Sequence, residues 1–151
     1  MIAYRLTKAQ YADTAFRGSR GRGRWHRRGV PMVYAADQPA TALLETLVHA
    51  GRGDLVQAEY VLFRIHLEEE THVLRLPGDQ RPEDWRAWPW PASTQRIGSF
   101  WHEQQASVAL AVPSAVVPIH TNVLLNIQHP DFSALTIDPP EPFSVDTRLA
   151  G

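Results

Sequence analysis

Arginines are the residues near the amino terminus that are best suited to chemistry. The stretch GSRGRGRWHRRGVPMVY, residues 18–34, holds five arginines in its first eleven positions and then turns apolar. Fourteen of the fifteen basic residues of the chain are arginine, whose planar guanidinium forms paired hydrogen bonds to phosphate or carboxylate. Residues 1–30 contain eight basic residues and one acidic residue, although the whole chain has a net charge of −1. This asymmetry favours a phosphate-bearing partner, with a merely solvated arginine cluster as the simpler interpretation.

The same cluster suggests an alternative function, that of an arginine-rich nucleic-acid-binding module. Residues 17–28 contain six arginines. A nucleic-acid arm is usually longer and rich in lysine, and it accompanies a reading helix or stacking aromatics on a sheet. None of these features is evident in the sequence. A catalytically inactive interaction subunit is a third hypothesis.

Two further polar residues stand in apolar surroundings. Glu45 lies in a predicted helix over residues 39–50, off the stripe formed by Ala40, Leu43, Leu44, Leu47 and Val48. This pattern predicts an exposed glutamate that pairs with His49 one turn later. Ser114 follows Pro113 in an otherwise apolar strand, so its hydroxyl must be hydrogen-bonded or functional.

Other chemistries are excluded or disfavoured by composition. The chain has no cysteine, so disulfides, thiolate metal sites and cysteine nucleophiles are ruled out. Asn122, Asn126 and His129 are expected to cap turns around Pro130, and the histidines lack the HExxH spacing of zinc enzymes. Neither GxGxxG nor GxxxxGK occurs. We therefore expect no metal.

The elements that must position these residues are short. Strands are predicted over residues 3–6, 31–36, 59–67 and 71–77. Hydrophobic alternation marks the strand over 59–67, which forms a hairpin with 71–77, and one or two further strands are predicted over 107–119, broken at Pro113. A short helix capped by Thr7, the helix over 39–50 with Asp37 as its cap, and helical spacing over 94–105 complete the pattern. Residues 81–94 are typical of a surface loop. The sequence predicts an α+β fold with mostly antiparallel β-sheets and a few short helices.

Length and hydropathy indicate one domain, residues 1–151. No apolar run approaches the roughly 20 residues of a membrane span, and the first residues lack a secretory pattern. We expect a cytoplasmic protein with no membrane partner.

Several segments, taken in order, resemble the RES-domain family over nearly the whole chain. They are YRL, GRGRWHRRGVPMVYAA, ALLETLVH, TQRIGSFWHEQQASVALAVPS and VPSAVVPIHTNVLLNIQHPDF. The resemblance implies a fold similar to the ADP-ribosyltransferase fold. It also implies the toxin component of a type II toxin–antitoxin system, an enzyme that consumes NAD⁺ by cleaving its nicotinamide–ribose bond.

The resemblance also assigns site residues. Arg24 falls on the arginine of the GRW motif, Glu45 on the glutamate of the ALxE helix and Ser114 on the serine of the VPS strand, which implies that these three are catalytic. Arg5 and Tyr34 match further pocket residues, so Arg5, Arg24 and Tyr34 are expected to bind NAD⁺, the substrate.

Physical chemistry fits these assignments. Arginines suit the pyrophosphate, and an aromatic ring suits the nicotinamide. A carboxylate at Glu45 would stabilise positive charge on the ribose, while Ser114 would hydrogen-bond the nicotinamide amide or the ribose.

The chain departs from the family pattern at two positions. His26 stands where the family usually has asparagine, and Ile127 stands where it usually has proline.

The resemblance also implies a partner, an Xre-type helix-turn-helix antitoxin whose tail blocks the pocket. The resemblance further implies a homodimer within a larger toxin–antitoxin complex that reaches DNA only through the antitoxin.

Overall fold

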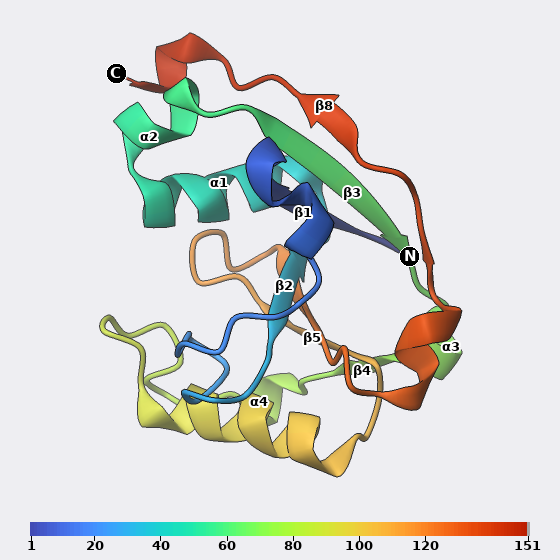
Figure 1. Cartoon of the computed structure of the whole chain (residues 1–151). Coiled ribbons are helices and arrows are strands. Elements are labelled where there is room, and N and C mark those ends of the chain that lie inside the picture. The colour runs from blue at the N-terminus through green and yellow to red at the C-terminus, as the bar shows by residue number, and fades with distance from the viewer. Residues whose placement is uncertain (151) are drawn as a thin grey trace.

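The chain forms one eight-stranded sheet flanked by helices, and the computed structural model describes residues 1–150 (Figure 1). The strand order is β4-β5-β6-β2-β1-β3-β7, and β8 also pairs with β3. The strands are β1 (Ile2–Lys8), β2 (Val33–Ala36), β3 (Tyr60–His66), β4 (Val73–Arg75), β5 (Ala109–Pro113), β6 (Thr121–Leu125), β7 (Thr136–Ile137) and β8 (Glu141–Phe143). The helices are α1 (Pro39–Ala50), α2 (Arg52–Gln57), α3 (Glu69–His72) and α4 (Ala92–Gln104), with 3-10 turns at Ala9–Thr14, Gly78–Gln80, Pro130–Ala134 and Thr147–Ala150.

Strand pairing confirms the predicted α+β class and corrects one connection. Every strand pair is antiparallel except β4–β5, which is parallel. The predicted hairpin between β3 and β4 is wrong, because β3 pairs with β1 on one side and with β7 and β8 on the other. With both edges of β3 occupied, the turn of helix α3 carries the chain to the far edge of the sheet (Figure 1).

The sheet separates two apolar clusters. One face carries a cluster of small and branched side chains, including Ala3, Val33, Ile65, Val123 and Leu125, and the half-buried Ile127 packs against it. The opposite face carries a second cluster beneath α4, formed by Trp25, Met32, Trp101, Leu110, Val112 and Leu124.

Helix α4 lies directly on the backbone of the arginine-rich segment. A Cβ atom added at Gly98 would lie 1.7 Å from the carbonyl oxygen of Trp25. Only glycine permits this approach, so the Arg24–Trp25 backbone is fixed between α4 and the sheet.

Helix α1 has the predicted ends but not the predicted N-terminal cap. Pro39 occupies its first turn and Gly51 follows its last residue, whereas Gln38 and not Asp37 precedes it as the cap. The carboxylate of Asp37 instead accepts hydrogen bonds from His120 and from the Thr121 N–H. This contact joins the start of α1 to the start of β6.

The predicted apolar stripe of α1 does not form the buried face. Leu44 is 37% exposed and Val48 is 60% exposed, whereas Thr41 and Ala42 are buried. The inward face of the helix borders a cavity, as described below, so polar side chains are tolerated there without the cost of burying them in a core.

Two smaller predictions also have definite outcomes. Thr7 caps no helix: it pairs with Val61 within the sheet, and the 3-10 turn Ala9–Thr14 has no side-chain cap. The predicted loop over residues 81–94 is confirmed for 81–91 and ends there, because α4 begins at Ala92; we call residues 82–91 the tryptophan loop. No helix within residues 1–150 is long and apolar enough to cross a membrane.

Candidate functional site

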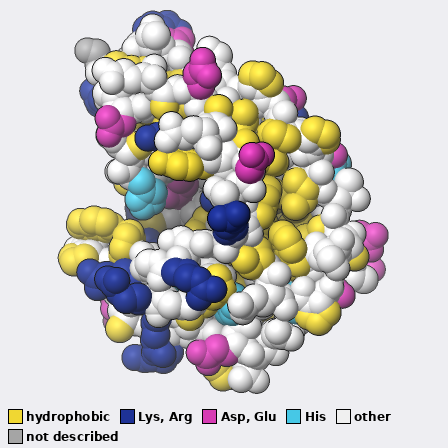
Figure 2. Space-filling view, in the orientation of Figure 1, with side chains coloured by type: hydrophobic (Ala, Val, Ile, Leu, Met, Phe, Trp, Pro, Cys, Tyr) yellow, Lys and Arg dark blue, Asp and Glu magenta, His cyan; other side chains and the backbone are white. Residues whose placement is uncertain are grey.

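Two cavities meet at Glu45. The first has a volume of about 470 Å³ and lies between β1 and α1; its lining includes Tyr4, Arg5, Lys8, Tyr11 and Tyr60. The second has a volume of about 260 Å³, and its lining includes Arg22, Arg24, His26, Trp88 and Trp90. Both are lined by Tyr34, Glu45, His49 and Asn122. Figure 2 shows the surface hollowed in this region, with basic side chains beside the hollow.

Glu45 is held by two hydrogen bonds to the same carboxylate oxygen. Its Oε1 accepts from the Ser114 hydroxyl at 2.8 Å and from the Asn122 amide at 3.0 Å. Within residues 1–150, no hydrogen bond to Oε2 and no ion pair to His49 is formed, so the predicted pairing with His49 is wrong. One oxygen fixes the glutamate and the other remains available to a ligand.

Ser114 lies behind Glu45 and not in either cavity. Its side chain is fully buried, and its hydroxyl accepts hydrogen bonds from the N–H groups of Val116 and Val117. Because these two N–H groups occupy the acceptor sites of the hydroxyl, its proton is free to be donated to Glu45. The structure thus brings Ser114 to Glu45, whereas neither set of cavity-lining residues includes it.

Arg24 reaches the second cavity while fastening the tryptophan loop. One terminal nitrogen donates to the carbonyl oxygens of Trp85 and Ala87, both at 2.8 Å. Burial lowers the pKa of Arg24, and the nearby charge of Glu45 opposes that shift. The loop is also held by Arg86, which donates to the carbonyl of Ala115.

Arg5 lines the first cavity and is held by backbone carbonyls. It donates through Nε to Ala15 and through a terminal nitrogen to Tyr34, at 2.7 and 2.8 Å. Burial lowers the pKa of Arg5 to about 10. No carboxylate in residues 1–150 forms an ion pair with this guanidinium, so an anionic ligand would supply its missing counter-charge.

Tyr34 is oriented by the two residues of the segment that follow Arg24. Its hydroxyl lies 3.2 Å from the Trp25 nitrogen and 2.6 Å from His26 Nδ1. The Trp25 N–H can only donate, so the tyrosine oxygen accepts this bond, and the same hydroxyl shares a second hydrogen bond with the His26 ring. Burial raises the pKa of Tyr34 and lowers the pKa of His26.

Gly23 makes room for this pair. A Cβ atom there would lie 2.7 Å from His26 Cε1 and 2.8 Å from the Tyr34 hydroxyl. His26 is 1% exposed, and it therefore acts within the structure as a buried partner of Tyr34. The departure from the family's asparagine thus falls on a residue that orients a cavity wall.

Asn122 was not predicted to belong to the site. Its predicted role in capping a turn is wrong, because it lies within β6, opposite Ala36 of β2 and Val112 of β5. The period of two along the strand places it on the same face as Leu124, a core position. A polar residue at a buried strand position was the signal available in the sequence.

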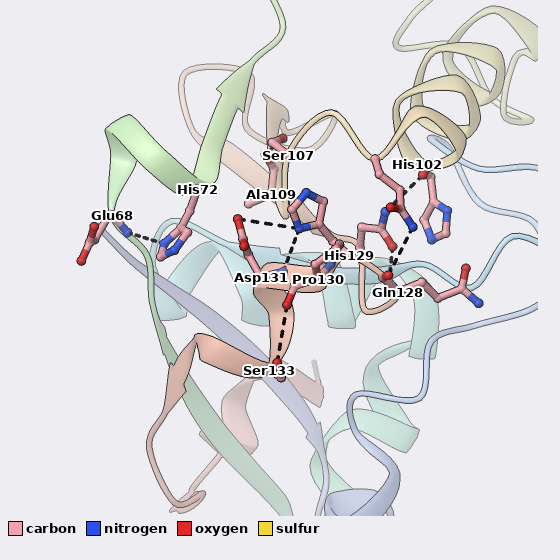
Figure 3. Close-up of polar contacts among 12 residues, drawn as sticks. Glu68, His72, His102, Ser107, Ala109, Gln128, His129, Pro130, Asp131 and Ser133 are labelled. Carbon is pink, nitrogen blue, oxygen red and sulfur yellow. Dashed lines mark hydrogen bonds and ion pairs between the residues drawn. The ribbon is translucent and has the colours of Figure 1, made fainter.

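Asn126 and His129 do cap turns, as predicted, and Figure 3 shows the contact of His129 with Asp131. Asn126 accepts from the Gln128 N–H and donates to the His102 carbonyl, and His129 accepts from the Asp131 N–H. His72 likewise accepts from the Glu68 N–H. These side chains serve the backbone, and residues 1–150 contain no cluster of three or more His, Asp or Glu residues that could hold a metal ion.

Comparison with known proteins identifies the family of this chain and agrees with its fold. A sequence model of the RES domain matches residues 2–146. A protein named Toxin Res from Photorhabdus laumondii is 40% identical, covering 99% of this chain and 97% of its own length. A Toxin Res from Yersinia enterocolitica is 37% identical, with 99% of each chain covered.

Two further comparisons concern a named activity and a solved fold. A Prs ADP-ribosylating toxin from Sphingobium is 36% identical over 84% of this chain and 80% of its own length. The crystal structure of the M. tuberculosis MbcT–MbcA toxin–antitoxin complex contains a similar fold, with a TM-score of 0.74, 20% identity, and coverage of 99% of this chain and 86% of that chain. The fold and site define an α+β protein with a carboxylate between two cavities. The chain belongs to the RES-domain family.

Proposed function

We propose that this protein is the toxin of a toxin–antitoxin system and that it cleaves the nicotinamide–ribose bond of NAD⁺. Relatives named Toxin Res match over nearly their full length, and another relative is named as an ADP-ribosylating toxin. The observation that carries the proposal is Glu45, which is fixed through one oxygen at the junction of two cavities. Each cavity also contains an arginine tied to backbone carbonyls.

The chemistry of the bond explains why a fixed carboxylate matters. As the bond breaks, its electron pair leaves with the nicotinamide nitrogen and positive charge develops on the ribose. A carboxylate beside that ribose stabilises the transition state more than the substrate. Glu45 supplies this charge through Oε2, and Ser114 is a positioning residue that holds Oε1.

The cavity walls suit the rest of the dinucleotide. Arg5 and Arg24 provide guanidinium donors for the pyrophosphate, and the ring of Tyr34 provides a flat apolar surface for the nicotinamide. Because the Tyr34 hydroxyl is already hydrogen-bonded to both Trp25 and His26, the residue offers the ligand its ring. No step of this scheme requires a metal.

The acceptor of the ribosyl group determines the type of enzyme. Water gives an NAD⁺ glycohydrolase, inorganic phosphate gives a phosphorylase, and a protein side chain gives an ADP-ribosyltransferase. Purified protein incubated with NAD⁺ alone, with phosphate and with cell lysate, followed by mass spectrometry, distinguishes the three. NAD⁺ that stays intact under all three conditions rejects the enzymatic proposal.

The proposed partner is an Xre-type antitoxin, with the toxin as a homodimer in the complex. The similar fold comes from a toxin–antitoxin complex. Residues 17–28 provide a basic rim on which an acidic tail would bind, and Arg22 within this rim lines the second cavity that the tail would cover. Co-expression with the neighbouring open reading frame should relieve growth arrest and yield a complex that no longer consumes NAD⁺. A complex that turns over NAD⁺ at the free rate would exclude blockage of the pocket.

A further inference from the structure

Asn122 has one hydrogen-bonding atom for which the protein supplies no partner. Its side chain is 9% exposed, and its Oδ1 is buried without a hydrogen bond to any atom of residues 1–150. The orientation of the amide is fixed by chemistry, because the Glu45 carboxylate only accepts and must therefore face the NH₂ group. Oδ1 consequently points away from the Glu45 oxygen that Nδ2 contacts.

The surrounding sheet leaves this acceptor to a ligand. Asn122 is flanked by β2 on one side and β5 on the other, where the backbone groups pair along the ladders. A buried acceptor without a donor costs free energy that a bound ligand recovers. The residue lines both cavities at their junction, so the missing donor is within reach of whatever occupies them.

From this geometry we propose that Asn122 is a substrate-binding residue whose Oδ1 accepts a hydrogen bond from the 3′-hydroxyl of the nicotinamide-bearing ribose. The inference rests on the proposed function. Glu45 must lie beside C1′ to stabilise the charge there, which brings Oε2 within reach of the neighbouring 2′-hydroxyl. Asn122 is joined to the same glutamate by a 3.0 Å hydrogen bond. Two adjacent acceptors therefore face the two adjacent donors of a ribose diol.

The proposal separates two roles of one side chain. The amide nitrogen of Asn122 holds Glu45, and its oxygen recognises the substrate. Loss of the first role slows turnover of every substrate alike. Loss of the second removes only the ability to distinguish a ribose that has the 3′-hydroxyl from one that lacks it.

The test compares NAD⁺ with an analogue that lacks the 3′-hydroxyl on the nicotinamide ribose. For the wild-type protein, kcat/KM should be about tenfold or more lower for the analogue, since a buried acceptor is left unpaired. For Asn122→Ala, both values should fall and their ratio should approach one. Asn122→Leu preserves the side-chain volume and should give the same ratio, which covers the case that the alanine variant does not fold.

Asn126→Ala provides a matched control. Asn126 is a buried asparagine that follows the same strand, but it contacts His102 and Gln128 and lines neither cavity. Its variant should retain the wild-type ratio, whatever its stability.

The outcomes separate this inference from the proposed function. Wild-type turnover with no preference for the 3′-hydroxyl overturns the role of Asn122. So does a preference that persists in both Asn122 variants, and a persistent preference would favour a nicotinamide carboxamide or solvent as the partner of Oδ1. In either case NAD⁺ cleavage still stands. Absence of any NAD⁺ turnover by the wild-type protein rejects the proposed function and this inference with it.

Discussion

The Ser114 hydroxyl donates a 2.8 Å hydrogen bond to Glu45, a residue 69 positions earlier in the chain. The serine contributes no surface to either cavity, so its effect on a substrate must pass through the glutamate. Both residues are expected to be catalytic, but Ser114 acts by positioning Glu45, and Glu45 acts on the substrate.

Replacement of Ser114 should therefore act on turnover and not on affinity. For Ser114→Ala we expect kcat to fall about tenfold to a hundredfold, the range for a hydrogen bond to a charged group, with KM changed less than threefold. Steady-state NAD⁺ consumption measures both constants. A large rise in KM with unchanged kcat would place Ser114 in direct contact with the substrate.

Removal of the Glu45 charge should greatly slow the reaction while the fold remains. Glu45→Gln keeps an oxygen that accepts from Ser114 and Asn122 but loses the charge, so we expect NAD⁺ cleavage to fall by about a hundredfold to a thousandfold. Growth arrest should disappear with it. The matched control is Glu103→Gln, on the exposed side of α4. Near-normal turnover by Glu45→Gln would show that the mechanism is wrong.

Arg24 should couple substrate binding to the tryptophan loop. In Arg24→Ala the carbonyls of Trp85 and Ala87 lose their donor, so we expect KM to rise about tenfold and the loop to become susceptible to limited proteolysis. Arg96→Ala, on the first turns of α4, serves as the control for loss of a positive charge. An unchanged KM together with faster proteolysis would assign Arg24 to the loop alone.

Stability should fall in mild acid because of two buried histidines. Burial lowers the pKa of both His26 and His102. Between about pH 6.5, the ordinary value for histidine, and those lower folded-state values, the unfolded chain binds more protons than the folded chain, so the free energy of unfolding decreases as pH falls. It should be level above about pH 7 as far as these groups are concerned.

Denaturant unfolding at a series of pH values measures this dependence. His26→Asn keeps a polar partner for Tyr34 but does not titrate, so its stability should decline less steeply in mild acid. An identical slope in the variant would mean that His26 does not contribute to the dependence.

The protein should bind nucleic acid weakly, contrary to the alternative of an arginine-rich arm. Arg24 is turned inward onto backbone carbonyls, which removes it from the exposed set. We expect no mobility shift of duplex or single-stranded oligonucleotides at micromolar protein and low salt. Tight binding that weakens steeply with salt would instead support the alternative, because each neutralised phosphate releases a counterion.

The sequence predicts the individual helices and strands of this fold better than it predicts how they pack and pair with one another. The ends of α1 follow from Pro39 and Gly51, β3 follows from alternation, and β1 and β2 lie in the short segments predicted as strands. The face of α1 was predicted incorrectly because a helix that borders a cavity need not bury its most apolar side. The connection from β3 to β4 was predicted incorrectly because strand pairing depends on which edges are already occupied.

The same distinction holds for the site. Glu45 and Ser114 were identified by resemblance to a family, since helical periodicity predicted an ordinary exposed glutamate. Their contact depends on the tertiary arrangement of α1 against the end of β5, which no local pattern encodes. Asn122 was missed for a related reason: capping propensity favoured a turn, while the strand pairing placed it beside a carboxylate.

The hydrogen bonds of Asp37 to His120 and to the Thr121 N–H fix the end of the short chain segment between Ser114 and Asn122. The segment joins Ser114 and Asn122, the two residues that donate to Oε1 of Glu45. Asp37 attaches the segment to the start of α1, the helix that carries Glu45. The tryptophan loop, by contrast, contributes Trp88 and Trp90 to the wall of the second cavity and makes no hydrogen bond to Glu45. A single-residue insertion between residues 115 and 120 would change the positions of Ser114 and Asn122 relative to Glu45, so a change in length here would disturb the carboxylate directly.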